Sequence, residues 1–205
     1  MRLVTLVALL LALAVAGCGG DDGDDGGGNA QESDCVTQGS ADLPELEEGK
    51  TYRLLFKTSE GDFTVELDRD KAPCTSASFV GLAEKGFFNG LKFHRIVPGF
   101  VIQGGDPQGD GTGGPGYSTV DEPPDDARYT KGVVAMAKTL SDPPGTAGSQ
   151  FFIVTAEDSG LEPVYAVLGK VVEGLDTVEK IGKLGGPDEQ PTKDVMIESV
   201  QVEKA

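Results

Sequence analysis

The sequence predicts a mainly β domain in which short strands close, or nearly close, into a barrel capped by two α-helices. Short segments of alternating or continuous apolar residues recur from residue 51 to the C-terminus, and only two stretches have the spacing of an amphipathic helix. The chain has 205 residues, which is enough for one core of ordinary size and some additional segments.

The first elements of this domain form a β-hairpin followed by a helix. Residues 52–57 and 63–68 place apolar side chains at alternate positions, and the sequence SEGD between them is typical of a hairpin turn. Pro73 begins a stretch with helical spacing that ends at Gly86.

The remaining segments predict further strands, one long loop and a second helix. Glycine, proline and aspartate recur in residues 104–124, so we expect a loop there. The strands are expected at residues 92–94, 100–103, 133–137, 151–155, 165–172 and 195–202, and the helix at residues 175–181.

The N-terminus has the form of a secretory signal. Arg2 precedes an apolar run over residues 3–15, which is too short for a typical membrane span. The sequence VAGC, ending at Cys18, resembles a bacterial lipobox, in which the signal is removed before a cysteine that then carries lipid. We therefore expect a signal peptide at residues 1–17 and a lipid on Cys18. The alternative is an ordinary signal peptide that leaves Cys18 as a free thiol.

A disordered tether is expected at residues 18–49, between this cysteine and a folded domain at residues 50–205. Residues 19–28 contain only glycine and aspartate, so they have no apolar side chain to bury. The aspartates lack the ligand spacing and the closing glutamate of a calcium loop, and a solvated spacer is the better interpretation.

The charge of the chain excludes some partners. The formal net charge is −17. Removal of residues 1–17 would remove one positive charge, that of Arg2, and make the net charge more negative still. Charge of this sign repels phosphates and anionic lipid headgroups, which argues against nucleic-acid partners and against electrostatic attachment to a membrane. The lipid would then provide the attachment, and the expected location is the extracytoplasmic face of the bacterial cell membrane.

Two cysteines remain once Cys18 is assigned to lipid, namely Cys35 and Cys74. Two cysteines in an exported chain favour a disulfide, which would tie the segment before the domain to its first helix. The alternative is two unpaired cysteines, because the sequence contains no information on their geometry.

The segment FHRIVPGFVIQGGD combines a cation and an amide with an apolar wall. Arg95 and Gln103 lie on either side of its apolar run. In a strand, alternation would put Phe100 and Ile102 on one face, and Val101 on the other face with the glutamine. A cation and an amide can bind a peptide carbonyl, yet the segment offers no obvious nucleophile.

A second segment, GSQFFI, adds an amide and an aromatic ring. Alternation puts Gln150 and Phe152 on the same face of a strand. His94 is the only histidine of the chain, which excludes multi-histidine metal sites, and we expect no metal. A structural role is the better interpretation of this histidine.

FHRIVPGFVIQGGD and GSQFFI, separated by a VAMA segment and followed by a YAVLGKV strand, resemble the cyclophilin family of peptidyl-prolyl isomerases. The resemblance extends over about residues 53–202. It implies a closed eight-stranded antiparallel β-barrel capped by two helices, with a substrate groove on the outer face and with Arg95 as the catalytic residue. The implied substrate-binding residues are Phe100, Val101, Gln103, Ala137, Gln150, Phe152, Leu161 and Tyr165.

The chain departs from the family pattern at several groove positions. Val101 stands where methionine is frequent, Lys138 where asparagine is frequent, and Tyr165 where eukaryotic members have histidine. Gly160 stands where many members have a large aromatic ring, which contributes to cyclosporin binding in the family. We therefore expect cyclosporin to bind weakly.

The resemblance implies a peptidyl-prolyl cis-trans isomerase that needs no cofactor. Together with the signal segment it predicts action on proline-containing segments of exported proteins as they fold, and a monomer is the default expectation. Rotation about an amide transfers no proton and forms no covalent bond, so a site without a base or a nucleophile is sufficient. Two alternatives remain. The first is a proline-peptide-binding module with little or no turnover, and the second is a purely structural surface protein.

Overall fold

The computed structural model describes residues 35–205, so the predicted signal peptide and the predicted lipidation site, Cys18, lie outside the described residues. The helices are α1 (Pro73–Glu84) and α2 (Leu175–Gly182). The strands are β1 (Val36–Gln38), β2 (Tyr52–Thr58), β3 (Gly61–Leu67), β4 (Arg95–Val97), β5 (Val101–Gly104), β6 (Ser118–Val120), β7 (Val133–Met136), β8 (Thr146–Ala147), β9 (Phe151–Val154), β10 (Val167–Glu173) and β11 (Ile197–Lys204).

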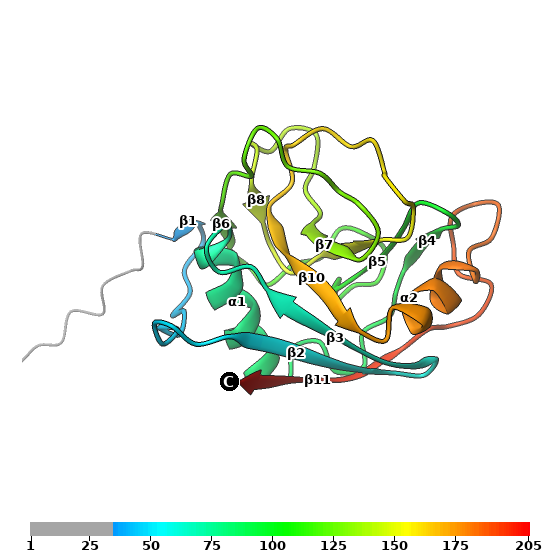
Figure 1. The fold of residues 1–205 in the computed structure, drawn as a ribbon, viewed down its shortest axis with the longest axis horizontal. Coiled ribbons are helices and arrows are strands. Elements are labelled where there is room, and N and C mark those ends of the chain that lie inside the picture. The colour runs from blue at the N-terminus through cyan, green and yellow to red at the C-terminus, as the bar shows by residue number, and fades with distance from the viewer. Residues whose placement is uncertain (1–34) are drawn as a thin grey trace, which may run out of the picture. The chain divides into compact units, whose positions relative to one another are not determined.

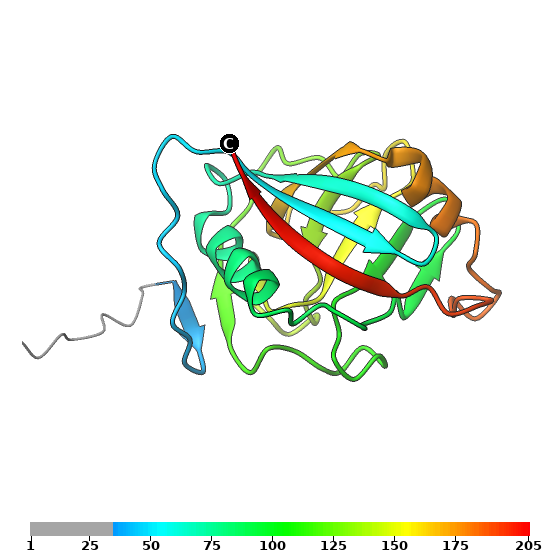
Figure 2. The same ribbon diagram turned by 90° about the horizontal axis from the view of Figure 1, so that it is seen from below.

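Eight of these strands form one antiparallel sheet, in the order β11-β2-β3-β10-β7-β9-β5-β4. The sheet curls on itself, and α1 and α2 lie at opposite ends of it (Figures 1 and 2). The predicted eight-stranded, mainly β architecture with two helices is therefore confirmed.

The closure of this barrel is partial, which agrees with the closed or nearly closed barrel that the strand pattern predicted and falls short of the full closure that the family resemblance implied. The edge strands β11 and β4 do not pair with each other. Two backbone hydrogen bonds connect the edges instead. The N–H of Phe93 donates to the carbonyl of Val195 at 3.0 Å, and the N–H of Ile96 donates to the carbonyl of Glu189 at 2.8 Å.

The main core lies inside the curl of the sheet and reaches both helices. Its centre is Phe151 on β9, which is fully buried. The Phe151 ring contacts four other phenylalanines at tilted or edge-to-face angles, with centroid distances from 5.5 to 6.3 Å. Such aromatic contacts add to the stabilisation that burial alone provides. The four partners are Phe56, Phe79, Phe88 and Phe93.

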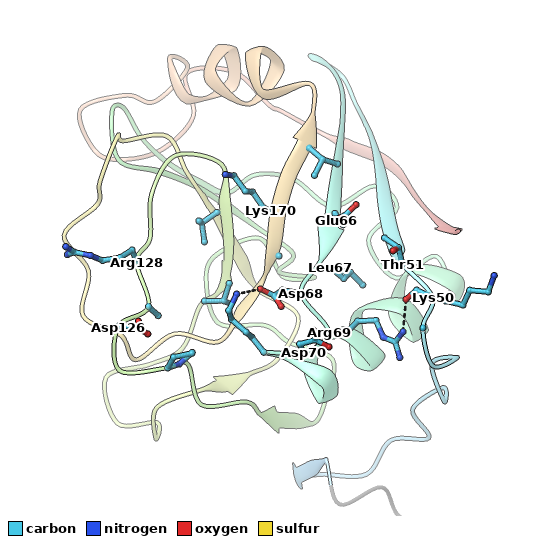
Figure 3. Close-up of a pocket in the computed structure, with 18 of the residues that line it drawn as sticks. Lys50, Thr51, Glu66, Leu67, Asp68, Arg69, Asp70, Asp126, Arg128 and Lys170 are labelled. Carbon is cyan, nitrogen blue, oxygen red and sulfur yellow. Dashed lines mark hydrogen bonds and ion pairs between the residues drawn. The ribbon is translucent and has the colours of Figure 1, made fainter.

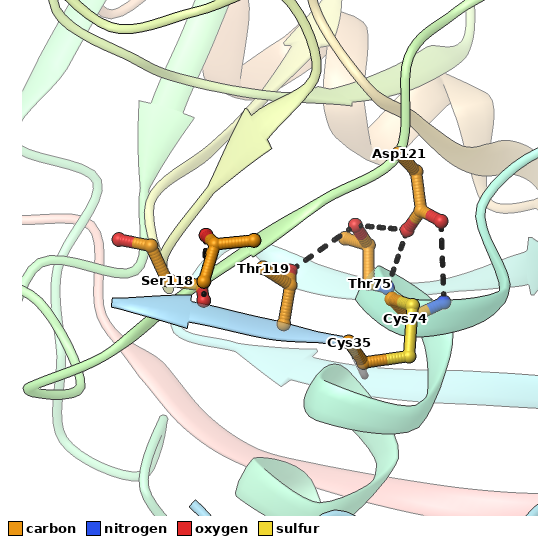
Figure 4. The surroundings of a disulfide bond; sticks show 7 residues. Cys35, Cys74, Thr75, Ser118, Thr119 and Asp121 are labelled. Atoms are coloured by element: carbon orange, nitrogen blue, oxygen red, sulfur yellow. Dashed lines mark hydrogen bonds between the residues drawn. A yellow bond between two sulfur atoms is a disulfide. The ribbon is translucent and has the colours of Figure 1, made fainter. Parts of the chain in front are cut away.

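Helix α1 begins at Pro73, as predicted, because the fixed φ of proline suits the first position of a helix. The preceding residue, Ala72, provides no side-chain cap. The carboxylate of Asp121, which follows β6, accepts hydrogen bonds from the backbone N–H of Thr75 at 2.6 Å and from its hydroxyl at 2.7 Å (Figure 4). This residue, distant in the sequence, therefore satisfies free N–H groups of the helix end.

Residues 35–49 pack on the domain, which corrects the prediction of a disordered tether through residue 49. Cys35 and Cys74 form the predicted disulfide, with an S–S distance of 1.99 Å (Figure 4). Strand β1 pairs with β6, and the guanidinium of Arg69 donates to three backbone carbonyls between residues 46 and 50. The folded part therefore extends further towards the N-terminus than the periodicity of the sequence indicated.

The prediction of a strand at residues 92–94 is also wrong. Lys92 forms only an isolated bridge with Met196, and the strand begins at Arg95. A tight turn determines this position, because the backbone N–H of Phe100 donates to the carbonyl of Val97 at 3.0 Å. The loop predicted at residues 104–124 contains one short strand, β6, and β10 and β11 each begin two residues later than predicted.

Candidate active site

A row of paired residues crosses neighbouring strands on the outer face of the sheet. Arg95 on β4 lies opposite Gln103 on β5, Gln103 lies opposite Phe152 on β9, and Phe152 lies opposite Ala135 on β7. Directly opposed residues of antiparallel strands share one face of the sheet. The pairing of four strands therefore brings a cation, an amide and an aromatic ring into one line.

A groove of about 230 Å³ lies over this row. Its floor belongs to a second apolar cluster, separate from the main core, in which Val101 and Phe152 are buried. The rings of Phe152 and Tyr165 meet nearly at right angles, with centroids 5.4 Å apart. The residues that line the groove are Arg95, Phe100, Val101, Gln103, Ala137, Lys138, Phe152, Leu161 and Tyr165.

The structure thus brings together all the residues that the sequence placed in the groove, except Gln150. Gln150 instead lines an adjoining hollow of about 720 Å³, which shares Gln103, Ala137 and Lys138 with the groove. Phe100 lines the groove together with Val101, although strand alternation put the two on opposite faces. The reason is that Phe100 belongs to the turn before β5, where alternation does not apply.

The polar edge of the groove is an ordered series of hydrogen bonds. The Nε2 of Gln150 donates to the carbonyls of Gly111 and Gly113, at 3.0 and 2.9 Å. The Nε2 of Gln103 donates to Gln150 Oε1 at 3.1 Å, which turns Gln103 Oε1 towards Arg95 Nη1 at 3.3 Å. These hydrogen bonds fix the orientation of both side-chain amides, and the series ends at the Arg95 guanidinium.

A buried carboxylate organises the loop that begins this series. Asp106 is 1% exposed, and it accepts hydrogen bonds from the backbone N–H groups of Gln108, Asp110 and Gly111. Burial alone raises the pKa of the Asp106 carboxyl, but these backbone donors outweigh burial and lower the pKa below its ordinary value.

Arg95 has a second partner, which the sequence did not indicate. Its Nε donates to Glu189 Oε2 at 2.6 Å, and the Arg95 side chain remains about one-third exposed. Glu189 lies in the loop between α2 and β11, and it is 94 residues away in the sequence. No local pattern could have connected the two.

Tyr129 is another residue to which no sequence pattern gave a role. It is buried beneath the groove, where its hydroxyl donates to the Tyr165 carbonyl at 2.6 Å and accepts from the Tyr165 backbone N–H at 3.0 Å. Its ring lies 6.3 Å from that of Phe152. An aromatic residue after a proline-rich loop was the only available signal, and it did not indicate a role.

Of the positions that depart from the family pattern, Val101, Lys138 and Tyr165 line the groove, and Gly160 precedes the lining residue Leu161. Lys138 places its Nζ 5.7 Å from the centroid of the Tyr165 ring and donates to the carbonyl of Asp142 at 3.0 Å. Gly160 has a φ of 67°, and nothing lies within 4 Å of where a side chain would begin. The space beside Gly160 is therefore open, and Lys138 adds a positive charge to the groove lining.

His94 is buried, with 5% exposure, and it does not line the groove. Neither ring nitrogen has a hydrogen-bond partner within residues 35–205. Burial lowers the pKa of the imidazole below its usual value, and the nearby cations Lys92 and Arg95 act in the same direction, whereas Asp106 and Asp110 oppose it.

A larger hollow, of about 820 Å³, shares no lining residue with this groove. Figure 3 shows the side chains that line it. Charges of both signs line it, among them Arg69, Asp126 and Lys170, and Lys71 pairs with Asp68 at 2.5 Å. It lacks the aromatic walls that would hold an apolar ring, so we place the candidate active site at the smaller groove.

Two further properties concern only the part of the chain that the structure describes. In residues 35–205, no three histidine, cysteine or acidic side chains are grouped so that they could hold a metal ion. Neither α1 nor α2, the helices of this part, has the length and apolar character needed to cross a membrane.

Comparison with known proteins identifies the family. The family model described as cyclophilin type peptidyl-prolyl cis-trans isomerase matches residues 53–202, so this chain belongs to the cyclophilin-type isomerase family.

The relatives in this family include bacterial proteins. A Mycobacterium leprae protein described as "Probable peptidyl-prolyl cis-trans isomerase B" is 40% identical over 173 residues, which cover 75% of this chain and 57% of the relative. A Mycobacterium tuberculosis protein of the same description is 41% identical over 70% of this chain and 52% of its own length. This chain therefore spans about half the length of these mycobacterial relatives. A Helicobacter pylori peptidyl-prolyl cis-trans isomerase is 40% identical over 68% of this chain and 86% of its own length.

A solved structure has the same fold. The cyclophilin-type isomerase of Cryptosporidium parvum superposes with a TM-score of 0.69 at 29% identity and covers 75% of this chain and 98% of its own. A second structure of that protein, in the presence of the dipeptide Ala-Pro, has a TM-score of 0.68.

Proposed function

We propose that this chain is a peptidyl-prolyl cis-trans isomerase in which Arg95 stabilises the twisted amide of an X-Pro bond. The observation that carries the proposal is the position of the guanidinium at the edge of an apolar groove, beside Gln103 and next to the rings of Phe152 and Tyr165. No nucleophile is required for such a reaction.

The chemistry is a rotation. Twisting a peptide bond breaks amide resonance against a barrier of about 18–20 kcal/mol, and uncatalysed exchange of an X-Pro bond takes roughly 10–100 s. In the twisted state the prolyl nitrogen becomes pyramidal and regains a lone pair. An N–H of Arg95 that donates to this lone pair stabilises the twisted state more than the planar state, which is the condition for catalysis.

The apolar walls hold the proline ring and exclude water. The planar amide is more dipolar than the twisted one, so a dry groove disfavours the ground state. Gln103 holds the carbonyl that precedes proline, because an amide NH₂ has two donors and only one of them is used by Gln150. The proposed substrates are proline-containing segments of exported proteins, and the proposed active form is a monomer.

We also propose that the protein is exported and anchored by lipid on Cys18. Two features support this: the apolar run before that cysteine and the Cys35–Cys74 disulfide, because disulfides persist in oxidising compartments. Labelling of cells that carry wild type or Cys18→Ser with a radioactive fatty acid tests it. The wild type is expected to carry the label and Cys18→Ser to lack it, and an unlabelled wild type or an equally labelled Cys18→Ser would exclude a lipid anchor on this residue.

The rival function is a module that binds proline peptides without turning them over. Two observations favour it, namely Lys138, which changes the charge of the groove lining, and the absence of a side chain at Gly160, next to the lining residue Leu161. Exchange of a proline tetrapeptide, measured with and without the full chain, separates the two functions. We expect faster exchange, whereas saturable binding with unchanged exchange would support the rival.

A further inference from the structure

Glu189 has an unusual backbone conformation. Its φ of 63° is left-handed, and within residues 35–205 it is the one non-glycine residue with a positive φ. Such a conformation strains most side chains, whereas glycine adopts it freely and asparagine adopts it at lower cost. The turn alone therefore does not explain why a glutamate stands here, and strained residues are often found at functional sites.

The loop that carries Glu189 is fixed against the edge strand β4. The backbone N–H of Ile96 donates to the Glu189 carbonyl at 2.8 Å, and the N–H of Gly186 donates to the Gln190 carbonyl at 2.7 Å. A side chain at Gly185 would begin 2.3 Å from the Ile96 carbonyl oxygen, so this close approach requires glycine. The loop backbone is thus held at the residue next to Arg95.

From this backbone the Glu189 side chain reaches the guanidinium. Its Oε2 accepts from Arg95 Nε at 2.6 Å, while Gln103 Oε1 accepts from Nη1 at 3.3 Å. A guanidinium has five N–H donors, so these two contacts hold it from two directions. The remaining three donors have no partner among the described residues and are available to a substrate.

We infer that Glu189 is a positioning residue, whose carboxylate holds the Arg95 guanidinium in the orientation that meets the prolyl nitrogen. This inference rests on the proposed function of Arg95. The side chains of the pair are 34% and 50% exposed, and an ion pair so exposed contributes little to stability. Its effect is therefore expected in the rate, through the orientation of a long and otherwise mobile side chain.

Measurements of kcat and of the unfolding temperature distinguish a role of Glu189 in orienting Arg95 from a role in folding. Glu189→Gln is expected to lower kcat by about 3- to 10-fold with KM unchanged, because the orientation of the guanidinium matters most in the transition state. Glu189→Gly is expected to lower kcat at least as much, although it relieves the backbone strain and should not lower the unfolding temperature. A merely structural role would lower the unfolding temperature and leave kcat per folded molecule unchanged.

The test is a double-mutant cycle on the full chain, with turnover of a proline tetrapeptide as the readout. The variants are wild type, Arg95→Ala, Glu189→Gln and the double variant. Asp188→Asn is the matched control, because it removes one charge from the same exposed loop and keeps an acceptor for the Gln190 N–H. We expect Asp188→Asn to have the wild-type kcat and Glu189→Gln to have no further effect in the Arg95→Ala background.

Two results would overturn the inference without affecting the proposed function of Arg95. The first is a wild-type kcat in Glu189→Gln while Arg95→Ala is impaired. The second is the same fold-loss of kcat when Glu189→Gln is introduced into wild type and into Arg95→Ala. Normal turnover of Arg95→Ala would overturn both proposals together.

Discussion

At the scale of single residues, the buried His94 is expected to make stability depend on pH. Burial holds its pKa in the folded state below the unfolded value of about 6.5. As the pH falls, the unfolded chain therefore binds the proton first. The contribution of the neutral ring to stability is complete above about pH 6.5 and is lost as the pH falls from there towards the folded-state pKa.

Denaturant unfolding of wild type and of His94→Leu at pH 7.5 and 5.5 measures this effect. Since both ring nitrogens lack partners within the described residues, leucine should be tolerated. We expect the wild type to lose more stability than His94→Leu over this interval. An equal loss in both proteins would show that His94 does not titrate with unfolding.

Tyr129 gives a second prediction at the same scale. Tyr129→Phe removes the hydroxyl that bonds both the carbonyl and the N–H of Tyr165, and it should cost about 1–3 kcal/mol of stability. We also expect KM for a proline peptide to rise a few-fold, because the Tyr165 ring lines the groove. Tyr117→Phe is the control, since its hydroxyl bonds Ser78 and lies outside the groove; it should leave KM unchanged. An unchanged KM in Tyr129→Phe would contradict the role of this hydroxyl.

The sequence predicted single residues well where a motif contained them. The motifs placed Arg95, Gln103 and Phe152 in one site, and strand pairing indeed puts them in one row. Glu189 and Tyr129 were missed, because their contacts join segments that are distant in the chain. A motif contains no information on which remote loop supplies a second partner.

At the scale of elements, the N-terminal arm, residues 35–49, is part of the fold. The Cys35–Cys74 disulfide spans a sequence separation of 39 residues, and in the chain-entropy description it contributes roughly 4 kcal/mol. We expect reductant to lower the free energy of unfolding by about this amount, measured by denaturant titration. The double variant Cys35→Ser and Cys74→Ser should be equally destabilised and indifferent to reductant, and a wild type unaffected by reductant would contradict this contribution.

Elements with strong periodicity could be predicted, and short paired segments could not. The β2–β3 hairpin and α2 lie where alternation and helical spacing predicted them, and α1, which is buried on most sides, begins at the proline that predicted its start. Strands β1, β6 and β8 are two or three residues long and pair only with one another, so they have too few residues to show a period. The position of β4 depends on the turn at residues 98–100, which local hydrophobicity does not reveal.

At the scale of the whole molecule, the curled sheet separates two functions of its apolar residues. One face encloses the main core, and the other carries the smaller cluster that forms the floor of the groove. A groove built on paired strands is more rigid than one built on loops, which suits a catalyst that must hold a guanidinium and a proline ring in fixed relation. The pattern of short strands and two helices predicted this architecture, and the family resemblance added the number of strands. The partial closure depends on backbone hydrogen bonds that no side chain specifies.

The most direct test of Arg95 catalysis compares kcat/KM of wild type, Arg95→Ala and Arg53→Ala on a proline tetrapeptide. Arg53 is a matched control, because it is a similarly exposed arginine that pairs with Glu66 and does not line the groove. We expect Arg95→Ala to lose about 100- to 1000-fold, as for the removal of one transition-state donor, and Arg53→Ala to retain wild-type turnover. A folded Arg95→Ala protein with wild-type kcat/KM would contradict catalysis by this guanidinium.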